Sequence, residues 1–220
     1  MNTKKIHLTA LAALLALAAL PCCSSHGKGI GPGHKYRSAD EWERASRNQT
    51  KAYTFEDFIA KPDYTLSRDI WCGPAMNEYA PADTYVVVLL KEQRGRLYIH
   101  GQVAMDFPVC SGRVGGRETP RGTFRVSEMK EFYRSHSYGS YLDSRGNVVR
   151  GNAVAGVPGP AGTHFEGADM PYWMRFNGGV GMHVGNVHRI GQSHGCVRVP
   201  KEACKLVYSK MGIGSKIIVK

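Results

Sequence analysis

The sequence predicts a mainly β fold with one late helix, preceded by a short helical extension. Two observations predict the fold class. Runs rich in β-branched residues, bounded by turn residues, recur between residues 85 and 126 and again near the C-terminus. Glycine is a poor helix former, and 18 of the 26 glycines lie between Gly101 and Gly195. With 42% hydrophobic and 21% charged residues, the chain can bury a core, which excludes wholesale disorder.

The N-terminus is typical of an export signal. Two lysines precede a 13-residue apolar run at residues 8–20, which is too short to span a bilayer. Residues 1–21 are therefore interpreted as a signal peptide. Cys22 and Cys23 follow at once, and lipid attachment at either, as in bacterial lipoproteins, stands beside ordinary signal cleavage nearby. The protein is expected in the periplasm or cell envelope, and lipid attachment would anchor it to the membrane through its N-terminus.

The net charge of the chain, taken together with its export, limits the kinds of partner that we expect. The formal net charge is +11, which indicates an anionic partner but not its kind. An exported basic protein of a bacterium meets anionic lipid and anionic cell wall. Nucleic acid is therefore not an expected partner.

Between the signal and the main domain, a tether and a helical extension are predicted. Residues 22–37 are rich in glycine and are interpreted as the flexible tether. Residues 38–80 are interpreted as an N-terminal extension. Ser38 and Thr54 are each followed three residues later by an acidic residue, a capping box that predicts a short helix at each position.

Residues 81–220 are predicted to form one catalytic domain. Its elements follow from β-branched runs, turn residues and helix-ending signals. A helix is expected at residues 201–211, between Pro200 and Gly212. Residues 151–171, rich in glycine and proline, are expected to be a long loop, either a lid over a site or a surface excursion. Strands are expected at residues 85–90, 96–100, 103–109, 123–126, 180–184 and 215–219.

One cysteine and three histidines lie within 14 residues of each other, from His183 to Cys196. A cysteine nucleophile needs an imidazole that takes its proton, and backbone N–H donors for the developing oxyanion. Ser193 and Gly195 are small residues that allow a tight turn beside the sulfur. These residues are the candidates for nucleophilic catalysis.

The same stretch resembles the signature of the L,D-transpeptidase (YkuD) family. Residues 193–198, Ser-His-Gly-Cys-Val-Arg, match the family motif at every position, and His183 matches its upstream histidine. Residues 107–113 and 119–124 resemble the family's Pro-Val-Ser-Thr-Gly segment and its Thr-Pro-x-Gly-x-Phe turn. The similarity covers residues 81–220 and implies a curved β-sheet or sandwich fold.

The resemblance also implies a reaction. Cys196 would attack the carbonyl before the terminal D-residue of a peptidoglycan tetrapeptide stem, releasing D-Ala, with His183 as the general base. Ser193 belongs to the motif, and His194 with the N–H groups of Gly195 and Cys196 would shape the oxyanion pocket. An amine would resolve the thioester, giving a 3→3 cross-link or an anchored protein, in cell wall biogenesis and cell shape. No cofactor and no metal are implied.

Several alternatives stay open at this point. His188 is a rival base, because only nine residues separate His183 from Ser193. His183, His188, His194 and Cys196 could also be counted as four zinc ligands, although the histidine spacing suits a helix or knuckle better than this glycine-rich stretch. With water as the acceptor the site would be an L,D-carboxypeptidase. The alternative to an enzyme is a cell-wall-binding module that has the fold but does not catalyse the reaction.

Four further residues are candidates for substrate binding. Under the resemblance Tyr172, Trp173 and Arg175 form a wall of the substrate groove, with Arg175 near an anionic stem. The alternative is a core strand with one arginine reaching the surface. Arg198 either binds a stem carboxylate or supports the turn.

One cysteine departs from the family pattern. Cys110 stands where the family has a small hydroxyl residue. Two interpretations are weighed: a buried small hydrophobic residue, or a Cys72–Cys110 disulfide that ties the extension to the domain.

Overall fold

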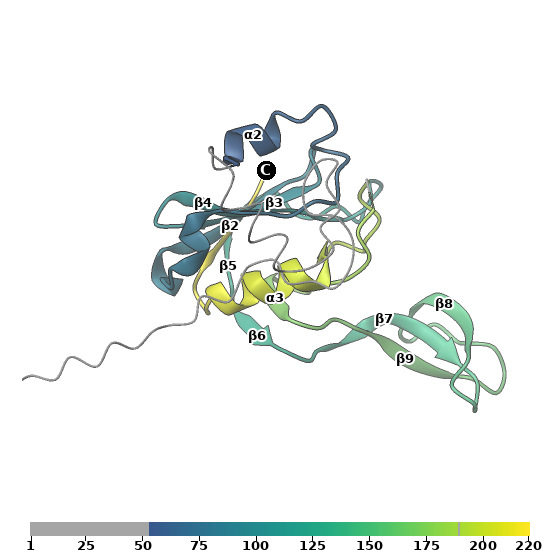
Figure 1. Cartoon of the computed structure of the whole chain (residues 1–220). Helices are drawn as coiled ribbons and strands as arrows, with labels where there is room; N and C mark the ends of the chain where they lie inside the picture. The colour runs from purple at the N-terminus through teal and green to yellow at the C-terminus, as the bar shows by residue number, and fades with distance from the viewer. Residues whose placement is uncertain (1–52, 189) are drawn as a thin grey trace, which may run out of the picture.

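The computed structural model describes residues 53–188 and 190–220. The predicted signal peptide, the lipidation candidates Cys22 and Cys23, the tether and the first helix of the extension lie outside the described residues. Figure 1 shows a body of sheets with one helix against them, and an arm that projects far from it. The structure is mainly β, which confirms the fold class. No helix of the described residues is both long and apolar enough to cross a membrane.

A six-stranded sheet, in the order β1-β4-β3-β2-β13-β5, forms the upper layer in Figure 1. The C-terminal strand β13 lies in its interior, parallel to β2 and antiparallel to β5. The predicted strands are confirmed, with ends shifted by one or two residues. The sheet consists of β1 (Trp71–Cys72), β2 (Thr84–Leu89), β3 (Arg94–Ile99), β4 (Gln102–Pro108), β5 (Gly122–Arg125) and β13 (Lys216–Val219).

A four-stranded sheet, in the order β12-β11-β10-β6, carries the residues of the predicted motif. It consists of β6 (Glu128–Lys130), β10 (Trp173–Asn177), β11 (Val180–Val184) and β12 (Val197–Val199). Helix α3 (Lys201–Lys210) follows β12, and the N–H of Met211 at its end donates to the Val207 carbonyl. One hydrophobic core joins both sheets and α3, with Val86, Met182 and Val207 all fully buried in it.

The projecting arm is a three-stranded sheet, in the order β8-β7-β9. Its strands are β7 (Arg134–Leu142), β8 (Val148–Val154) and β9 (His164–Asp169). The prediction of one long loop at residues 151–171 is therefore wrong for residues 151–154 and 164–169, which are strand, whereas residues 155–163 do connect the two strands as a loop. Glycine was interpreted as a loop signal, yet Gly139 and Gly167 lie where a Cβ would come within 1.9 Å of a backbone oxygen of the neighbouring strand. Their absent side chains let the strands approach.

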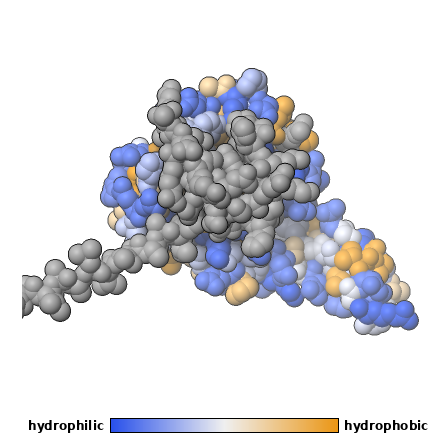
Figure 2. All heavy atoms as spheres, in the orientation of Figure 1, coloured by the Kyte–Doolittle hydropathy of each residue, from blue (hydrophilic) through white to orange (hydrophobic). Residues whose placement is uncertain are grey.

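The surface of the arm is partly apolar. Figure 2 shows hydrophobic residues gathered on it, away from the body of the molecule. Val148, Val149 and Val157 are exposed there.

The second helix of the extension forms as predicted. In α2 (Phe55–Ile59), the Thr54 hydroxyl accepts a hydrogen bond from the Asp57 N–H at 3.1 Å, and the Asp57 carboxylate accepts one from the Thr54 N–H at 3.2 Å. This is the predicted capping box. Phe58 is buried in a small aromatic cluster with Tyr64 and Trp71. Two 3₁₀ turns, η1 (Pro74–Asn77) and η2 (Pro81–Asp83), complete the extension.

The cysteine pairing differs from the prediction. Cys72 is disulfide-bonded, whereas Cys110 is a free and fully buried thiol. A Cys72–Cys110 bridge is therefore wrong. The Cys110 thiol donates weakly to the Ile190 carbonyl, shortly before the predicted motif at residues 193–198, at 3.5 Å.

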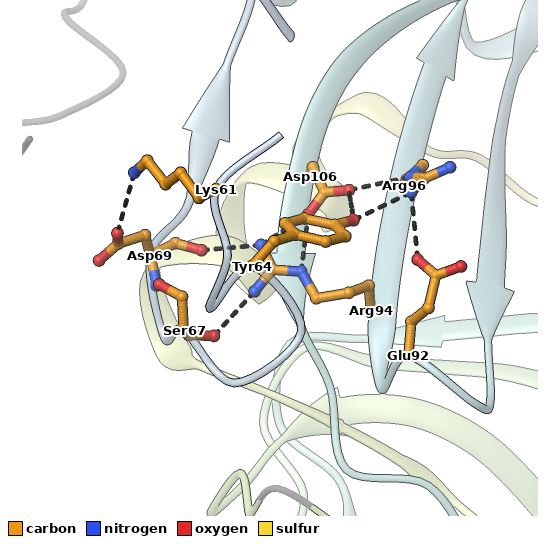
Figure 3. A network of polar contacts seen from close by, with 8 residues as sticks. All are labelled: Lys61, Tyr64, Ser67, Asp69, Glu92, Arg94, Arg96 and Asp106. Carbon is orange, nitrogen blue, oxygen red and sulfur yellow. Dashed lines mark hydrogen bonds and ion pairs between the residues drawn. The ribbon is translucent and has the colours of Figure 1, made fainter. Parts of the chain in front are cut away.

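A buried network of charges joins the extension to the six-stranded sheet (Figure 3). Arg94 and Asp106 are 0% exposed, and the Arg94 guanidinium lies 2.6 Å from the Asp106 carboxylate. The other Asp106 oxygen accepts from Arg96 at 3.0 Å and from the Tyr64 hydroxyl at 2.7 Å. Arg94 also donates to the carbonyls of Ser67 and Asp69. The extension is therefore held by the sheet through hydrogen-bonded buried charges.

Candidate active site

The parallel pair β11 and β12 brings the two halves of the motif together. His183 is the register partner of Arg198, and Met182 is that of Val197. Cys196 immediately precedes β12, and its thiol donates weakly to the Gly179 carbonyl at 4.0 Å. The Arg198 charge acts on both the His183 imidazole and the Cys196 sulfur, so both groups lie near this guanidinium.

His183 is a buried, neutral imidazole. It is 6% exposed, and its Nδ1 lies 2.8 Å from the Val184 carbonyl oxygen. That oxygen can only accept, so Nδ1 carries the proton and Nε2 keeps a free lone pair. Burial lowers the pKa of His183 to about 4, with the Arg198 charge acting in the same direction and the Val184 carbonyl against it. The imidazole is therefore neutral at physiological pH.

Cys196 rests as a thiol. Burial raises the pKa of its sulfur, while the Gly181 N–H and the charges of Arg198 and Arg175 oppose that effect. A thiol of raised pKa holds little thiolate at neutral pH. A thiol in this state can attack a carbonyl only if a base takes its proton, and a neutral imidazole such as that of His183 can do so.

The turn at residues 193–196 is held by two hydroxyl side chains. Gly195 has φ +119°, which side chains rarely tolerate. The Ser193 hydroxyl accepts from the Gly195 N–H at 3.0 Å and donates to the Cys196 carbonyl. The Thr119 hydroxyl donates to the Gly195 carbonyl at 2.8 Å and accepts from the Gly112 N–H at 2.9 Å. The segment 107–124, which carries the two upstream motifs, thus supports the turn directly.

One part of the predicted oxyanion pocket needs correction. The N–H of Gly195 is already bonded to Ser193, so it is not free for an oxyanion. Among the residues that the structure describes, the backbone N–H of Cys196 has no acceptor. That group is the remaining backbone donor of the predicted pair.

A second set of hydrogen bonds holds residues 193–198 against the segment around Cys110. Cys110 and Arg198 exchange both backbone hydrogen bonds at 2.9 Å, and the Ser193 N–H donates to the Ser111 carbonyl at 3.0 Å. Gln93 in turn holds Ser111, accepting from its N–H at 2.9 Å and donating to its hydroxyl at 2.8 Å. Sequence reasoning missed Gln93, since a lone glutamine in a polar turn carries no signal.

His194 is held by the arm. Its ring stacks on that of Tyr138 in β7, with centroids 4.4 Å apart and planes within 13°. Tyr138 was missed because its strand was not predicted. Burial lowers the pKa of His194, and the charges of Arg117, Arg113 and Arg198 lower it further.

The three residues of the predicted groove wall lie in different surroundings. Trp173 is 1% exposed, and its indole donates to Glu128 at 3.0 Å, so the prediction that it lines a groove is wrong. The Arg175 guanidinium lies 2.8 Å from the same carboxylate. Tyr172 is half-buried against Tyr208 of α3. The alternative of a core strand with one arginine at the surface describes β10 better.

His188, the alternative candidate for the base, lies in different surroundings from His183. His188 is exposed and lines a small hollow with residues 65–68 of the extension, Gln93 and Val187, but not with Cys196. Within residues 53–188 and 190–220, no three His, Cys, Asp or Glu side chains gather as a metal site.

The buried imidazole has a consequence for stability. Between about pH 6.5 and pH 4 an unfolded chain protonates His183 while the folded chain does not, so stability falls as the pH falls through this window. We expect this residue to contribute about 3 kcal/mol to that fall. Denaturant unfolding from pH 7 to 4 measures it, with His183→Gln as the control. Equal pH dependence in both proteins would contradict the buried neutral state.

The hydroxyl of Thr119 is expected to matter more than its shape. Thr119→Val keeps the volume but leaves the buried Gly195 carbonyl and Gly112 N–H without partners. We expect a loss of about 2 to 4 kcal/mol in the free energy of unfolding. Thr119→Ser keeps the hydroxyl and should cost less than half as much. If the two variants lose the same stability, the hydrogen bonds do not hold the turn.

The chain is similar to known proteins over the domain that contains these residues. Residues 83–219, more than half of the chain, match the profile of the YkuD L,D-transpeptidase catalytic domain. No curated protein matches the chain.

Solved structures similar to this chain are L,D-transpeptidases from Stackebrandtia nassauensis (19% identity, TM-score 0.46, covering 66% of this chain and 62% of that one), Mycobacterium smegmatis (20%, 0.47, 63% and 58%) and Xylanimonas cellulosilytica (22%, 0.45, 65% and 63%). The chain thus spans 58–63% of their length. Family membership rests on the profile match, and by that match the chain belongs to the YkuD family of L,D-transpeptidase catalytic domains.

Proposed function

We propose that the protein is a cysteine L,D-transpeptidase that acts on the peptide stems of peptidoglycan. One observation supports the proposal: His183 is a buried neutral imidazole paired in register with Arg198, and the Arg198 charge also acts on the Cys196 sulfur. A wall-binding module does not need a nucleophile beside a base. Family membership supports the reaction class.

In the acylation step, Nε2 of His183 takes the proton from the Cys196 sulfur as the sulfur attacks the carbonyl before the terminal D-residue of a tetrapeptide stem. The oxyanion that forms accepts a hydrogen bond from the N–H of Cys196. The carbon–nitrogen bond then breaks, and the imidazolium gives its proton to the departing amine of D-Ala. The product is a thioester on Cys196.

In the second step an amine attacks the thioester. His183 takes a proton from that amine, and the thiolate leaves and is reprotonated. A second stem as acceptor gives a 3→3 cross-link, and a protein amine gives anchoring. With water as the acceptor the same site is an L,D-carboxypeptidase.

The proposal also includes the location of the protein outside the cytoplasm. The apolar run at residues 8–20 supports export to the periplasm or cell envelope, and Cys22 or Cys23 is the proposed lipid site. Mass spectrometry of the mature N-terminus tests this, because a diacylglyceryl cysteine and an unmodified residue differ in mass.

The test of the reaction is incubation of the protein with a tetrapeptide stem and analysis of both partners by mass spectrometry. We expect an adduct of the stem without D-Ala on Cys196, and a cross-linked product when a second stem is present. Release of tripeptide alone would identify the carboxypeptidase. Binding to cell wall without any adduct would contradict an enzymatic role.

A further inference from the structure

The proposed nucleophile lies in a turn that one neighbouring segment holds at both ends. Before the nucleophile, the Ser193 N–H donates to the Ser111 carbonyl at 3.0 Å, and the Arg113 N–H donates to the Ser193 carbonyl at 3.1 Å. After it, Cys110 and Arg198 exchange both backbone hydrogen bonds at 2.9 Å. The position of this neighbouring segment therefore sets the position of the sulfur.

Within that segment, Ser111 depends on the side chain of Gln93. The pairing of β3 with β4 ends at Pro108, after which the Val109 N–H donates to the Gln93 carbonyl at 2.9 Å. In the part of the chain that the structure describes, the Ser111 N–H has no backbone acceptor and donates instead to Oε1 of Gln93 at 2.9 Å. Nε2 of Gln93 donates to the Ser111 hydroxyl at 2.8 Å. The side-chain amide thus takes the place of a backbone partner.

Gln93 is itself held firmly in place. It is 8% exposed and has φ +50°, in the left-handed region that favours glycine. The second hydrogen of its amide group donates to the Leu90 carbonyl at 2.7 Å. The next residue, Arg94, donates to the carbonyls of Ser67 and Asp69 in the extension (Figure 3). A strained backbone persists only where its surroundings fix it, and such positions gather at functional sites.

The chain that enters the turn packs directly on the residue that Gln93 holds. A Cβ at Gly191 would lie 2.4 Å from the Gly112 carbonyl oxygen and 3.0 Å from the Ser111 hydroxyl oxygen. Only a glycine allows so close an approach. A displacement of Ser111 would therefore be passed to the turn through this contact as well as through the hydrogen bond to Ser193.

We propose that Gln93 is a positioning residue for the Cys196 nucleophile and that it acts through Ser111. This role rests on the proposed function. Gln93 fixes Ser111, and Ser111 fixes Ser193 and with it the sulfur relative to the His183 imidazole. Attack on a carbonyl tolerates little misplacement, since a shift of about 1 Å can cost about a hundredfold in rate. The side chain therefore serves the rate of acylation and not the binding of the stem.

The test uses Gln93→Gly, which separates the side chain from the backbone. Glycine adopts φ +50° without strain, so the turn between β2 and β3 keeps its shape while both contacts with Ser111 are lost. We expect the maximal rate of Cys196 acylation at saturating tetrapeptide stem to fall by about tenfold to a hundredfold. The stem concentration that gives half of this rate should change by less than about threefold. Intact mass spectrometry at several stem concentrations measures both.

A second measurement needs no substrate. Burial is the largest cause of the raised pKa of the Cys196 thiol, and a loosened turn admits water while the charges of Arg198 and Arg175 remain. The pKa of the thiol should therefore fall, and the pH profile of its alkylation by iodoacetamide should shift by about half a pH unit or more to lower pH. Faster alkylation together with slower acylation distinguishes a displaced nucleophile from a general loss of stability, which thermal unfolding reports separately.

Two further variants test the route of the effect. Asn152→Gly is the matched control, because Asn152 also has a left-handed φ of +51° but is exposed in β8 of the arm. It should keep the acylation rate and the alkylation profile of wild type. Ser111→Ala removes the hydroxyl that accepts from Gln93 and should slow acylation less than Gln93→Gly does. The double variant should be slower than Gln93→Gly by less than about twofold, because the two residues act through one contact.

Each outcome has a distinct meaning. If Gln93→Gly keeps the acylation rate and the alkylation profile of wild type, the positioning role is overturned. A higher half-maximal stem concentration at an unchanged maximal rate would place Gln93 in stem binding and overturn it too. Effects that simply add in the double variant would overturn the route through Ser111. If wild type forms no adduct with the stem, the proposed function fails, and the alkylation profile then decides the role of Gln93.

Discussion

Cys196→Ala is expected to abolish formation of the stem adduct, and His183→Ala to slow it by about a hundredfold to ten-thousandfold. Alanine removes the only proposed nucleophile in the first case. In the second, the sulfur remains, but its raised pKa leaves little thiolate at neutral pH. The rate of adduct formation by intact mass spectrometry measures both.

The matched control is His188→Ala, which removes the rival imidazole. His188 is exposed and lines a hollow with the extension, so its loss should change the rate by less than about threefold. The residual rate of His183→Ala should rise with pH above neutrality, because hydroxide then supplies the thiolate that the imidazole no longer does. If His188→Ala removes the activity and His183→Ala does not, the base has been wrongly assigned.

Asp106→Asn is expected to cost about 3 to 5 kcal/mol in the free energy of unfolding, because it leaves the fully buried Arg94 without its counter-charge. Arg96 and the Tyr64 hydroxyl lose a charged acceptor at the same time. Denaturant unfolding at neutral pH measures the loss.

Glu92→Gln is the control, since Glu92 is 38% exposed and pairs with Arg96 at the rim of the same network. It should cost less than about 1 kcal/mol. A loss in Asp106→Asn no larger than in Glu92→Gln would show that the buried charges do not hold the extension.

The sequence predicted the elements that combine β-branched runs with clear turns. Residues 180–184 were predicted to be a strand and are β11 without any shift, and the late helix differs by one residue at its end. The arm was not predicted. Its strands are largely exposed, so they lack a hydrophobic alternation, and Gly139 and Gly167 serve as contact points between strands instead of loop residues.

The roles of the site were only partly predictable. The spacing of the motif singled out His183 and Cys196, because a thiol nucleophile needs a nearby base whatever the fold. The spacing could not tell that the Gly195 N–H is occupied by Ser193, or that Trp173 is buried. Both facts depend on how a turn closes and how a sheet packs.

The sequence by itself determined the fold class, the family and the candidate nucleophile and base, since these follow from local patterns and a contiguous motif. The tertiary structure decided the state and surroundings of those groups. His183 is neutral because it is buried, and the turn at Cys196 is held by Thr119, while Tyr138 of the arm covers His194. Burial and hydrogen-bond partners come from segments far apart in the chain, so only their packing fixes the pKa values and the free donors of the site.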